Sequence, residues 1–429
     1  MKERLSGFAA RYTMCKEKIR ISYIKGSATG LSSSVLASAS PSFRVRLTTL
    51  LLVVVVAGMS QGLLLPLLSI MLEDSGVSSD MNGINSAAMY IGIFCTMFFV
   101  EKPVMRFGYK KVILVGITLV TLANLLFPFT ESLAIWFVLR LLVGVGDSSL
   151  HYATQLWIVS SSPADRRGKF ISLYGMAYGL GFSLGPLGIN LLPLGRAVPF
   201  LVSSVFFVTV LMLVLRMKNE MPERVARGSA SENRFVKTYR LAWFVLIPGF
   251  LYGLMEASMN SNFPLYGLRI NLSQHWISLL LMAFGVGALI LQLPLGIWSD
   301  RIGRKPVLIG CGVVGALAFF AIPVAGDNIA LLFVLFAIAG GVVGSFYSLG
   351  LAYAADILPR AILPAANVIA SIHFSIGSIM GPTLGGYGIR YVSVHSIFLF
   401  LGAAFLVFAL LGFGFRPKIV EVQKVEISS

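Results

Sequence analysis

The chain has 429 residues, of which 57% are hydrophobic and only 12% are charged. A soluble domain carries about 25% charged residues, so this composition excludes a set of soluble domains and indicates a protein that lies largely within a lipid bilayer. The net charge of +16 is also typical of nucleic-acid-binding proteins, but the positions of the basic residues exclude that class.

Twelve apolar segments follow one another, each near the roughly 20 residues that a helix needs to cross about 30 Å of hydrocarbon. They cover residues 47–72, 82–100, 112–130, 133–161, 169–193, 197–216, 241–266, 276–298, 306–324, 329–355, 363–389 and 394–415. With a cytoplasmic N-terminus, the outer loops hold only Arg196, Arg269 and Arg390. This is the positive-inside pattern. It predicts an all-α membrane protein with twelve transmembrane helices, both termini cytoplasmic, in the plasma or inner membrane.

The polar segments divide the chain into five parts. Residues 1–45 are basic and Ser-rich without an apolar core, which favours a disordered cytoplasmic tail, with a transit peptide as the alternative. A mixed-charge linker, residues 217–240, separates two six-helix halves, residues 46–216 and 241–416, and residues 417–429 form a second tail. The three cysteines show no metal-binding spacing, so no metal is expected.

The two halves share a pattern of glycine and proline. When one half is shifted by 195 or 196 residues, GFSLGP coincides with GSIMGP, Gly108 with Gly303 and Gly144 with Gly340. The matched packing residues are Gly181, Gly185 and Pro186 in the first half and Gly377, Gly381 and Pro382 in the second. A repeat of six spans is typical of transporters whose halves rock around a central site.

A charged loop, GIWSDRIGRK, lies between the eighth and ninth predicted spans. Its motif residues are Gly296, Asp300, Arg301, Gly303, Arg304 and Lys305. Asp300 lies near a helix end, where its carboxylate can pair with basic residues or with a neighbouring helix N-terminus. We expect these charges to stabilise one conformation, the alternative being that they act only as topological signals.

This loop resembles the G-x-x-x-D-R-x-G-R-[KR] motif of the major facilitator superfamily. The corresponding first-half segment, EKPVMRFGYKK, keeps Arg106 and Gly108 but has Glu101 at the glycine position and Met105 at the acid position. The resemblance covers about residues 46–416 and implies a twelve-helix fold in two halves. RLLVGVG, residues 140–146, is similar to an element of proton-coupled members, and GFSLGPLG is similar to an element of antiporters. Together these similarities imply export.

Ionisable residues follow one face of the fourth predicted span. Arg140, Gly144, Asp147 and His151 are spaced so that they share one stripe of a helix. Ionisable groups at membrane depth are costly unless they pair or face water, so they are functional candidates. Asp147 and His151 could relay a proton, with Arg140 favouring the charged form of Asp147; a purely structural buried triad is the alternative.

The seventh predicted span contributes a second acid, Glu256. Tyr252, Asn260 and Phe263 lie on the same helix face. Glu256 could load and release protons or balance the charge of a cationic substrate, and the alternative is a permanently protonated structural residue. The other candidates for the lining of a central cavity are Gln61, Tyr174, Tyr178, Gln292 and Tyr347. Such a lining suits an amphipathic organic molecule.

The sequence contains no phosphate-binding loop, dinucleotide-binding pattern or HExxH motif, so neither an enzyme nor a cofactor is expected. We predict a monomeric secondary transporter that exports a small amphipathic compound in exchange for protons, in contact with membrane lipids. A facilitator or proton symporter for a small metabolite is one alternative. A membrane sensor or scaffold without transport activity is another.

Overall fold

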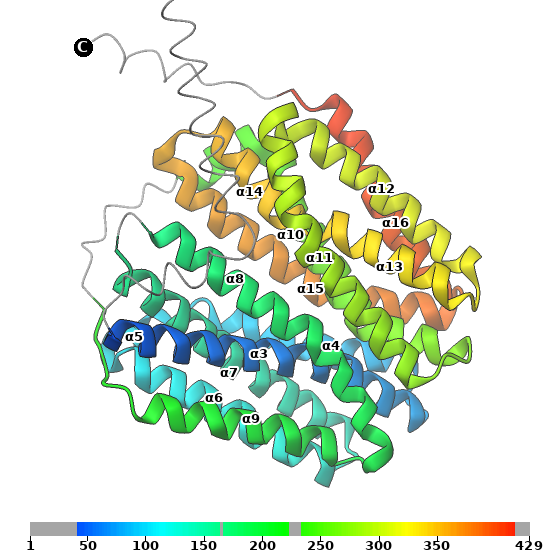
Figure 1. The fold of residues 1–429 in the computed structure, drawn as a ribbon. Helices are drawn as coiled ribbons and strands as arrows, with labels where there is room; N and C mark the ends of the chain where they lie inside the picture. Colours follow the sequence, from blue (N-terminus) through cyan, green and yellow to red (C-terminus); the bar gives the residue numbers. More distant parts are fainter. Residues whose placement is uncertain (1–40, 164–165, 223–232, 417–429) are drawn as a thin grey trace, which may run out of the picture. The chain divides into compact units, whose positions relative to one another are not determined.

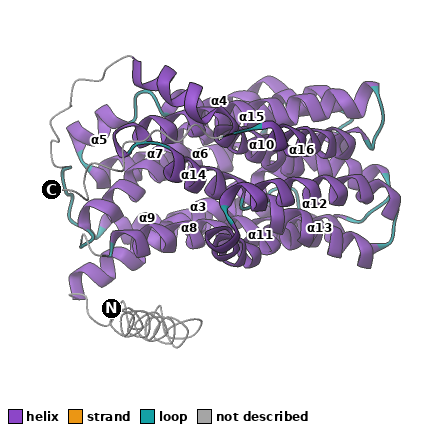
Figure 2. Ribbon diagram, turned by 90° about the horizontal axis from the view of Figure 1, so that it is seen from above, coloured by secondary structure: helices purple, strands orange, loops and turns teal. Residues whose placement is uncertain are grey.

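The computed structural model describes residues 41–163, 166–222 and 233–416, and all secondary structure in these ranges is helical (Figures 1 and 2). The chain divides into two compact units, residues 1–49 and 50–429. In the first unit the described residues, 41–49, form the beginning of helix α3 (Pro41–Asp74). Residues 1–40 of the predicted N-terminal tail and 417–429 of the C-terminal tail lie outside the described residues.

The helices follow the predicted spans closely. The first half continues with α4 (Ser79–Thr96), α5 (Glu101–Phe107), α6 (Tyr109–Leu126), η1 (Phe127–Phe129), α7 (Leu133–Ser161), α8 (Arg167–Leu184), η2 (Gly185–Leu194) and α9 (Val198–Leu215). The second half contains α10 (Asn233–Arg269), α11 (Gln274–Ile302), α12 (Arg304–Ala325), α13 (Ile329–Val343), α14 (Phe346–Ile357), η3 (Arg360–Ile362), α15 (Leu363–Tyr391) and α16 (Ser396–Gly414). In Figure 1 the blue-to-green helices α3–α9 lie together, as do the yellow-green-to-red helices α10–α16.

Eleven helices in the described part of the chain are long and apolar enough to cross a membrane. A twelfth span is present if α4 and α5, which are bent by 57° relative to each other, are counted as one. The predicted all-α membrane fold is therefore confirmed. The sequence also accounts for one local break, because Pro186 and Pro193 lie in the 3₁₀ segment η2, where α8 ends.

Close helix packing repeats between the two halves. A Cβ atom added to Gly181 would lie 2.1 Å from the carbonyl oxygen of Val55 on α3. In the second half, a Cβ at Gly377 would lie 2.1 Å from the carbonyl oxygen of Phe250 on α10. Only glycine permits backbones to approach this closely in membrane helices. The two glycines are separated by the repeat offset seen in the sequence, and so are the two residues that they contact.

The loop motifs show the same symmetry. Lys110 Nζ donates to the carbonyl oxygens of Leu215 and Met217, each at 2.7 Å, at the end of α9. Lys305 Nζ donates to the carbonyl oxygen of Phe415, at 2.6 Å, just after α16. Lysine side chains commonly satisfy the last carbonyls of a helix. The two halves are thus related in their contacts as well as in their sequence.

Helices of the two halves pack against each other on two sides. A Cβ at Gly83 on α4 would lie 2.2 Å from the carbonyl oxygen of Pro382 on α15, so these helices touch backbone to backbone. On the other side, Ser183 of α8 lies against Gly285 of α11. We call the end of the helices that carries loop residues 75–78 the 75–78 end, and the opposite end, which carries Gly303, the Gly303 end.

Candidate functional site

The first half contributes a hydrogen-bonded cluster built on α7, α8 and α3. His151 Nδ1 lies 2.7 Å from the hydroxyl of Tyr174, and His151 Nε2 lies 3.6 Å from Oδ1 of Asp147. The hydroxyl of Tyr178 donates to Oε1 of Gln61 at 2.6 Å, and the ring of Tyr178 packs edge-on against His151. Five predicted site residues are therefore brought together at membrane depth.

Glycine packing on α3 makes this cluster possible. A Cβ at Gly62 would lie 2.2 Å from the carbonyl oxygen of Phe182, and one at Gly58 would lie 2.6 Å from that of Tyr178. Since α3 and α8 approach this closely, Gln61 can reach the hydroxyl of Tyr178. Asp147 and His151 are four residues apart on α7, which places both side chains on one face of the helix.

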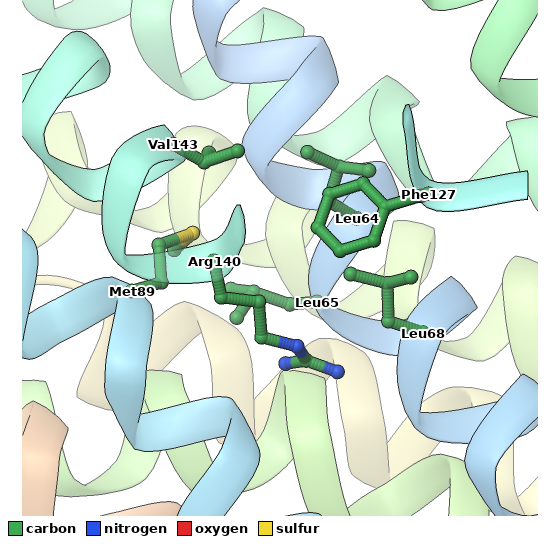
Figure 3. Close-up of a pocket in the computed structure, with 7 residues that line it drawn as sticks. All are labelled: Leu64, Leu65, Leu68, Met89, Phe127, Arg140 and Val143. Atoms are coloured by element: carbon green, nitrogen blue, oxygen red, sulfur yellow. The ribbon is translucent and has the colours of Figure 1, made fainter. Parts of the chain in front are cut away.

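Arg140 lies apart from this cluster. Its Nη1 donates to Oγ of Ser86 on α4 at 2.8 Å, while Nε and Nη2 have no hydrogen-bond partner among the described residues. Figure 3 shows the side chain among apolar neighbours that include Leu65, Leu68 and Met89. The cavity there has a volume of about 10 Å³, about the space that one water molecule needs. The structure gives Arg140 a hydroxyl partner rather than the carboxyl of Asp147.

The second half places a carboxyl beside aromatic rings. Glu256 on α10 is 5% exposed, and its Oε2 atom has no hydrogen-bond partner among the described residues. Tyr252, one turn earlier on α10, interacts electrostatically with Glu256. The ring of Tyr252 lies 6.3 Å from that of Tyr347 and 5.9 Å from that of Phe374, centroid to centroid. Asn260 donates to the backbone carbonyl of Glu256 at 2.8 Å, so this hydrogen bond does not involve the Glu256 carboxyl.

Two tyrosines lie within electrostatic range of the acids of both halves. Tyr90 on α4 and Tyr178 on α8 each interact electrostatically with both Asp147 and Glu256. Tyr90 is 1% exposed, and its hydroxyl has no hydrogen-bond partner among the described residues. Sequence reasoning missed Tyr90 and Phe374. The spacing of Ser86 and Tyr90 on one face of a span was the available signal for Tyr90.

Two predicted cavity residues lie elsewhere. Phe263 is fully buried and packs against Phe336, at 4.6 Å between ring centroids, and against Tyr266. Gln292 is exposed on α11. Neither is brought next to Glu256 by a contact that the structure shows, although Phe263 shares its helix.

The loop motif forms a charged network at the Gly303 end. Arg304 contacts Asp300 of its own loop, and its Nε lies 3.3 Å from Oδ2 of Asp356 at the end of α14. Gly303 has a φ of 98°, a left-handed conformation that glycine adopts without strain. Arg301 is exposed, and Gly296 has open space where a Cβ would lie. The network therefore joins α11, α12 and α14 within one half.

The first-half copy of this loop and its neighbouring helix α7 form hydrogen bonds with residues at the beginning of the linker. Gly108 has a φ of 85°, and Asn219 accepts from the backbone amide of Lys110 at 3.1 Å. The carboxyl of Glu220 accepts a hydrogen bond from Trp157 Nε1 at 2.7 Å. Arg106 stacks over the ring of Phe107. Linker residues thus occupy the region where the second half has its ion pairs.

At the 75–78 end, side chains of the two halves form ion pairs. Arg390 on α15 pairs with Asp80 and donates to Ser78 at 2.9 Å. Arg269 on α10 pairs with Glu73 on α3 at 2.8 Å. Asn190 of η2 donates to Ser278 of α11 at 2.9 Å. These contacts hold the two halves together at the 75–78 end, which is therefore closed.

Replacing Arg390 by Gln should weaken this closure. Asp80 is 8% exposed on its side chain and would lose its cationic partner, whereas in the open state water can solvate it. Because Arg390 is 42% exposed, we expect the ratio of closed to open protein to fall by only about threefold. The rate of cross-linking between cysteines placed at residues 190 and 278 measures the closed fraction. The double variant Asp80→Asn/Arg390→Gln should recover part of the loss; a double variant worse than the single one would contradict the pairing.

No group of three or more His, Cys, Asp or Glu side chains suited to a metal ion occurs in the part of the chain that the structure describes. The arrangement instead offers buried groups that can exchange protons and rings that can contact an organic molecule. A fold of membrane-spanning helices in two related halves, with such a site between them, defines a membrane transporter.

Comparison with known proteins identifies its family. The sequence profile of the Major Facilitator Superfamily matches residues 50–277 and 245–428, so the chain belongs to this superfamily. The chain is 38% identical over 355 residues to the uncharacterized MFS-type transporter YfkF of Bacillus subtilis (strain 168), covering 82% of this chain and 90% of the relative. It is 25% identical over 379 residues to Multidrug resistance protein 2 of the same organism, covering 82% and 90%.

The solved structures agree on the fold. A crystal structure of the nucleoside transporter NupG superposes with a TM-score of 0.69 at 14% identity and covers 86% of this chain and 98% of the NupG chain. This likeness concerns the fold alone. The sequence predicted a member of this superfamily, a small-molecule transporter and a protein that is not an enzyme. The family membership confirms these predictions.

Proposed function

We propose that this chain is a proton-coupled exporter of a small amphipathic organic compound that works by alternating access. The carrying observation is the pair of buried Asp147 and partly buried His151, whose charge can change only by proton exchange. Tyr90 and Tyr178 interact electrostatically with Asp147 and also with Glu256 of the other half. Proton binding shifts an equilibrium between two states only if its affinity differs between them. A site formed by both halves meets this condition, because its geometry changes when the halves rock.

The closed 75–78 end is compatible with export. The basic residues of the inner loops support a cytoplasmic Gly303 end, with both termini on that side and the protein in the cell membrane. In that orientation the structure is the inward-facing state, in which a cytoplasmic compound would bind. The name of one relative, Multidrug resistance protein 2, supports export of organic compounds. We further propose that the monomer is the transporting unit and that its basic inner loops attract anionic lipids.

Everted vesicles test this function. Vesicles that contain the wild-type protein are loaded with acid, and a pH-sensitive dye reports the luminal pH while amphipathic cations, neutral drugs and sugars are added in turn. Export in exchange for protons predicts alkalinisation of the lumen with particular compounds and none in vesicles without the protein. Silence across the whole panel, with the protein shown to be folded and inserted, would contradict proton-coupled export of an amphipathic compound.

A further inference from the structure

The acids of the two halves differ in their polar neighbours. In the first half, Asp147 has the imidazole of His151 at 3.6 Å, and His151 Nδ1 bonds with the hydroxyl of Tyr174, although His151 Nε2 has no hydrogen-bond partner among the described residues. In the second half, Oε2 of Glu256 is buried and has no hydrogen-bond partner among the described residues. A buried carboxylate without a partner is costly. Glu256 therefore needs a proton or a cation that comes from outside the described residues.

The protein provides no such cation nearby. None of the ion pairs within the described part of the chain involves Glu256, and the groups shown to interact with it electrostatically are the phenols of Tyr90, Tyr178 and Tyr252. Arg140, the arginine among the predicted site residues, donates a hydrogen bond to Ser86. A ligand that brings its own positive charge would complete this part of the site.

Three aromatic rings pack against one another, and one of them, that of Tyr252, lies one turn from Glu256 on α10. Tyr252 from α10, Tyr347 from α14 and Phe374 from α15 have mutual centroid distances of 6.3, 5.9 and 6.0 Å. Ser371 lies 3.2 Å from the hydroxyl of Tyr347 and holds that ring in place. All three rings are half-buried, unlike the fully buried Phe263 on the same face of α10. The part of each ring that remains exposed can contact a ligand.

We propose that Tyr252, Tyr347 and Phe374 form an aromatic cage that, with Glu256, binds the ammonium group of an organic cation, while Asp147 and His151 carry the exchanged proton. This inference rests on the proposed function and divides its two tasks between the halves. The face of a ring attracts a cation within about 6 Å of its centroid, and the carboxylate supplies the balancing charge. An uncharged ligand would leave the carboxylate unpaired, so the cage favours a cation with an apolar body.

The division of cation binding and proton exchange between Glu256 and Asp147 is consistent with the groups that surround each acid. Asp147 faces His151 on α7, the phenols of Tyr174 and Tyr178 on α8, and Tyr90 on α4. These groups can pass or share a proton, and none of them is the apolar ring of a phenylalanine. Glu256 instead has Tyr252, one ring of the cage, one turn away on α10. The charges of both acids act on Tyr90 and Tyr178, so occupation of one acid can affect the other.

Equilibrium binding tests the cage without any pH gradient. The probe is 2-phenylethyl-trimethylammonium, whose charge does not change with pH, and its uncharged tert-butyl isostere is the comparison ligand. Binding is measured by calorimetry on the purified full-length protein in detergent. The wild type should prefer the cation about tenfold. Glu256→Gln should remove this preference, and Phe374→Leu should weaken cation binding about tenfold, whereas Phe374→Tyr, which keeps a ring, should restore it.

Asp147→Asn separates the two roles. This variant should still bind the probe, with an affinity that no longer changes with pH, and should no longer exchange protons when it binds, which a dye in weakly buffered solution reports. Thermal unfolding verifies that each variant is folded. Loss of cation binding in Asp147→Asn, an unaffected Phe374→Leu variant, or a wild type that does not distinguish the two ligands would each overturn the proposal. If the cage binds the cation but everted vesicles show no proton exchange, the proposed export fails while cation binding stands.

Discussion

Replacing Gly83 by Ala should leave each half folded but should prevent the halves from closing at the 75–78 end. A Cβ at this position would lie 2.2 Å from the carbonyl oxygen of Pro382, an atom of the backbone of α15 that cannot rotate away. The other close atoms also belong to the opposite half, at Pro382 and Thr383. Overpacking of this kind costs about 1–3 kcal/mol, so the closed fraction and the transport rate should fall roughly tenfold or more.

Gly310→Ala is the matched control. A Cβ at Gly310 on α12 would meet no atom within 4 Å, so the same substitution should be neutral there. Cross-linking of cysteines at residues 190 and 278, in a background without native cysteines, measures closure in both variants. Transport in vesicles is measured in parallel. A Gly83→Ala protein that cross-links and transports like the Gly310→Ala protein would show that the two helices do not need their close approach.

The membrane fold was predictable because its signals are local. Spans follow from runs of apolar residues, which the helices of the structure match. The repeat was visible in the glycines, since Gly181 and Gly377 both serve backbone contacts that no other residue permits. Details that depend on neighbouring elements were less accessible. The helix α10 begins at Asn233, inside the predicted linker, and a 3₁₀ segment replaces the end of the fifth predicted span.

The candidate site was predictable only in part. The spacing of Asp147 and His151 placed them on one helix face, and Tyr252 lies one turn from Glu256 for the same reason. Spacing along one helix does not reveal which faces of different helices meet. Phe374 and Tyr90 therefore escaped notice, and Arg140 was expected near Asp147 although its partner is Ser86 on α4. The ion pairs at the 75–78 end join residues far apart in the sequence and were missed for the same reason.

Replacing Asp147 by Asn should abolish export driven by a pH gradient while leaving exchange of substrate across the membrane. Asparagine has nearly the same shape, so the contacts to His151 and the packing of α7 should persist. It cannot release a proton, and the equilibrium between the two states then no longer depends on protons at this site. We expect the gradient-driven rate to fall by roughly tenfold or more, because the side chain at membrane depth can no longer ionise, which is what makes it a functional candidate.

The measurement compares two assays on the same vesicles. Uptake driven by an imposed pH gradient reports coupling, and exchange of labelled for unlabelled compound without a gradient reports binding and conformational cycling. Glu131→Gln is the control, since this carboxyl pairs with Arg196 at a side-chain exposure of 77% and takes no part in the site. Loss of both activities in Asp147→Asn would make the residue structural, and full gradient-driven transport would exclude it as the proton carrier. Only loss of gradient-driven transport with retained exchange assigns the proton to Asp147. In that outcome the transport cycle still runs, but the pH gradient no longer drives it.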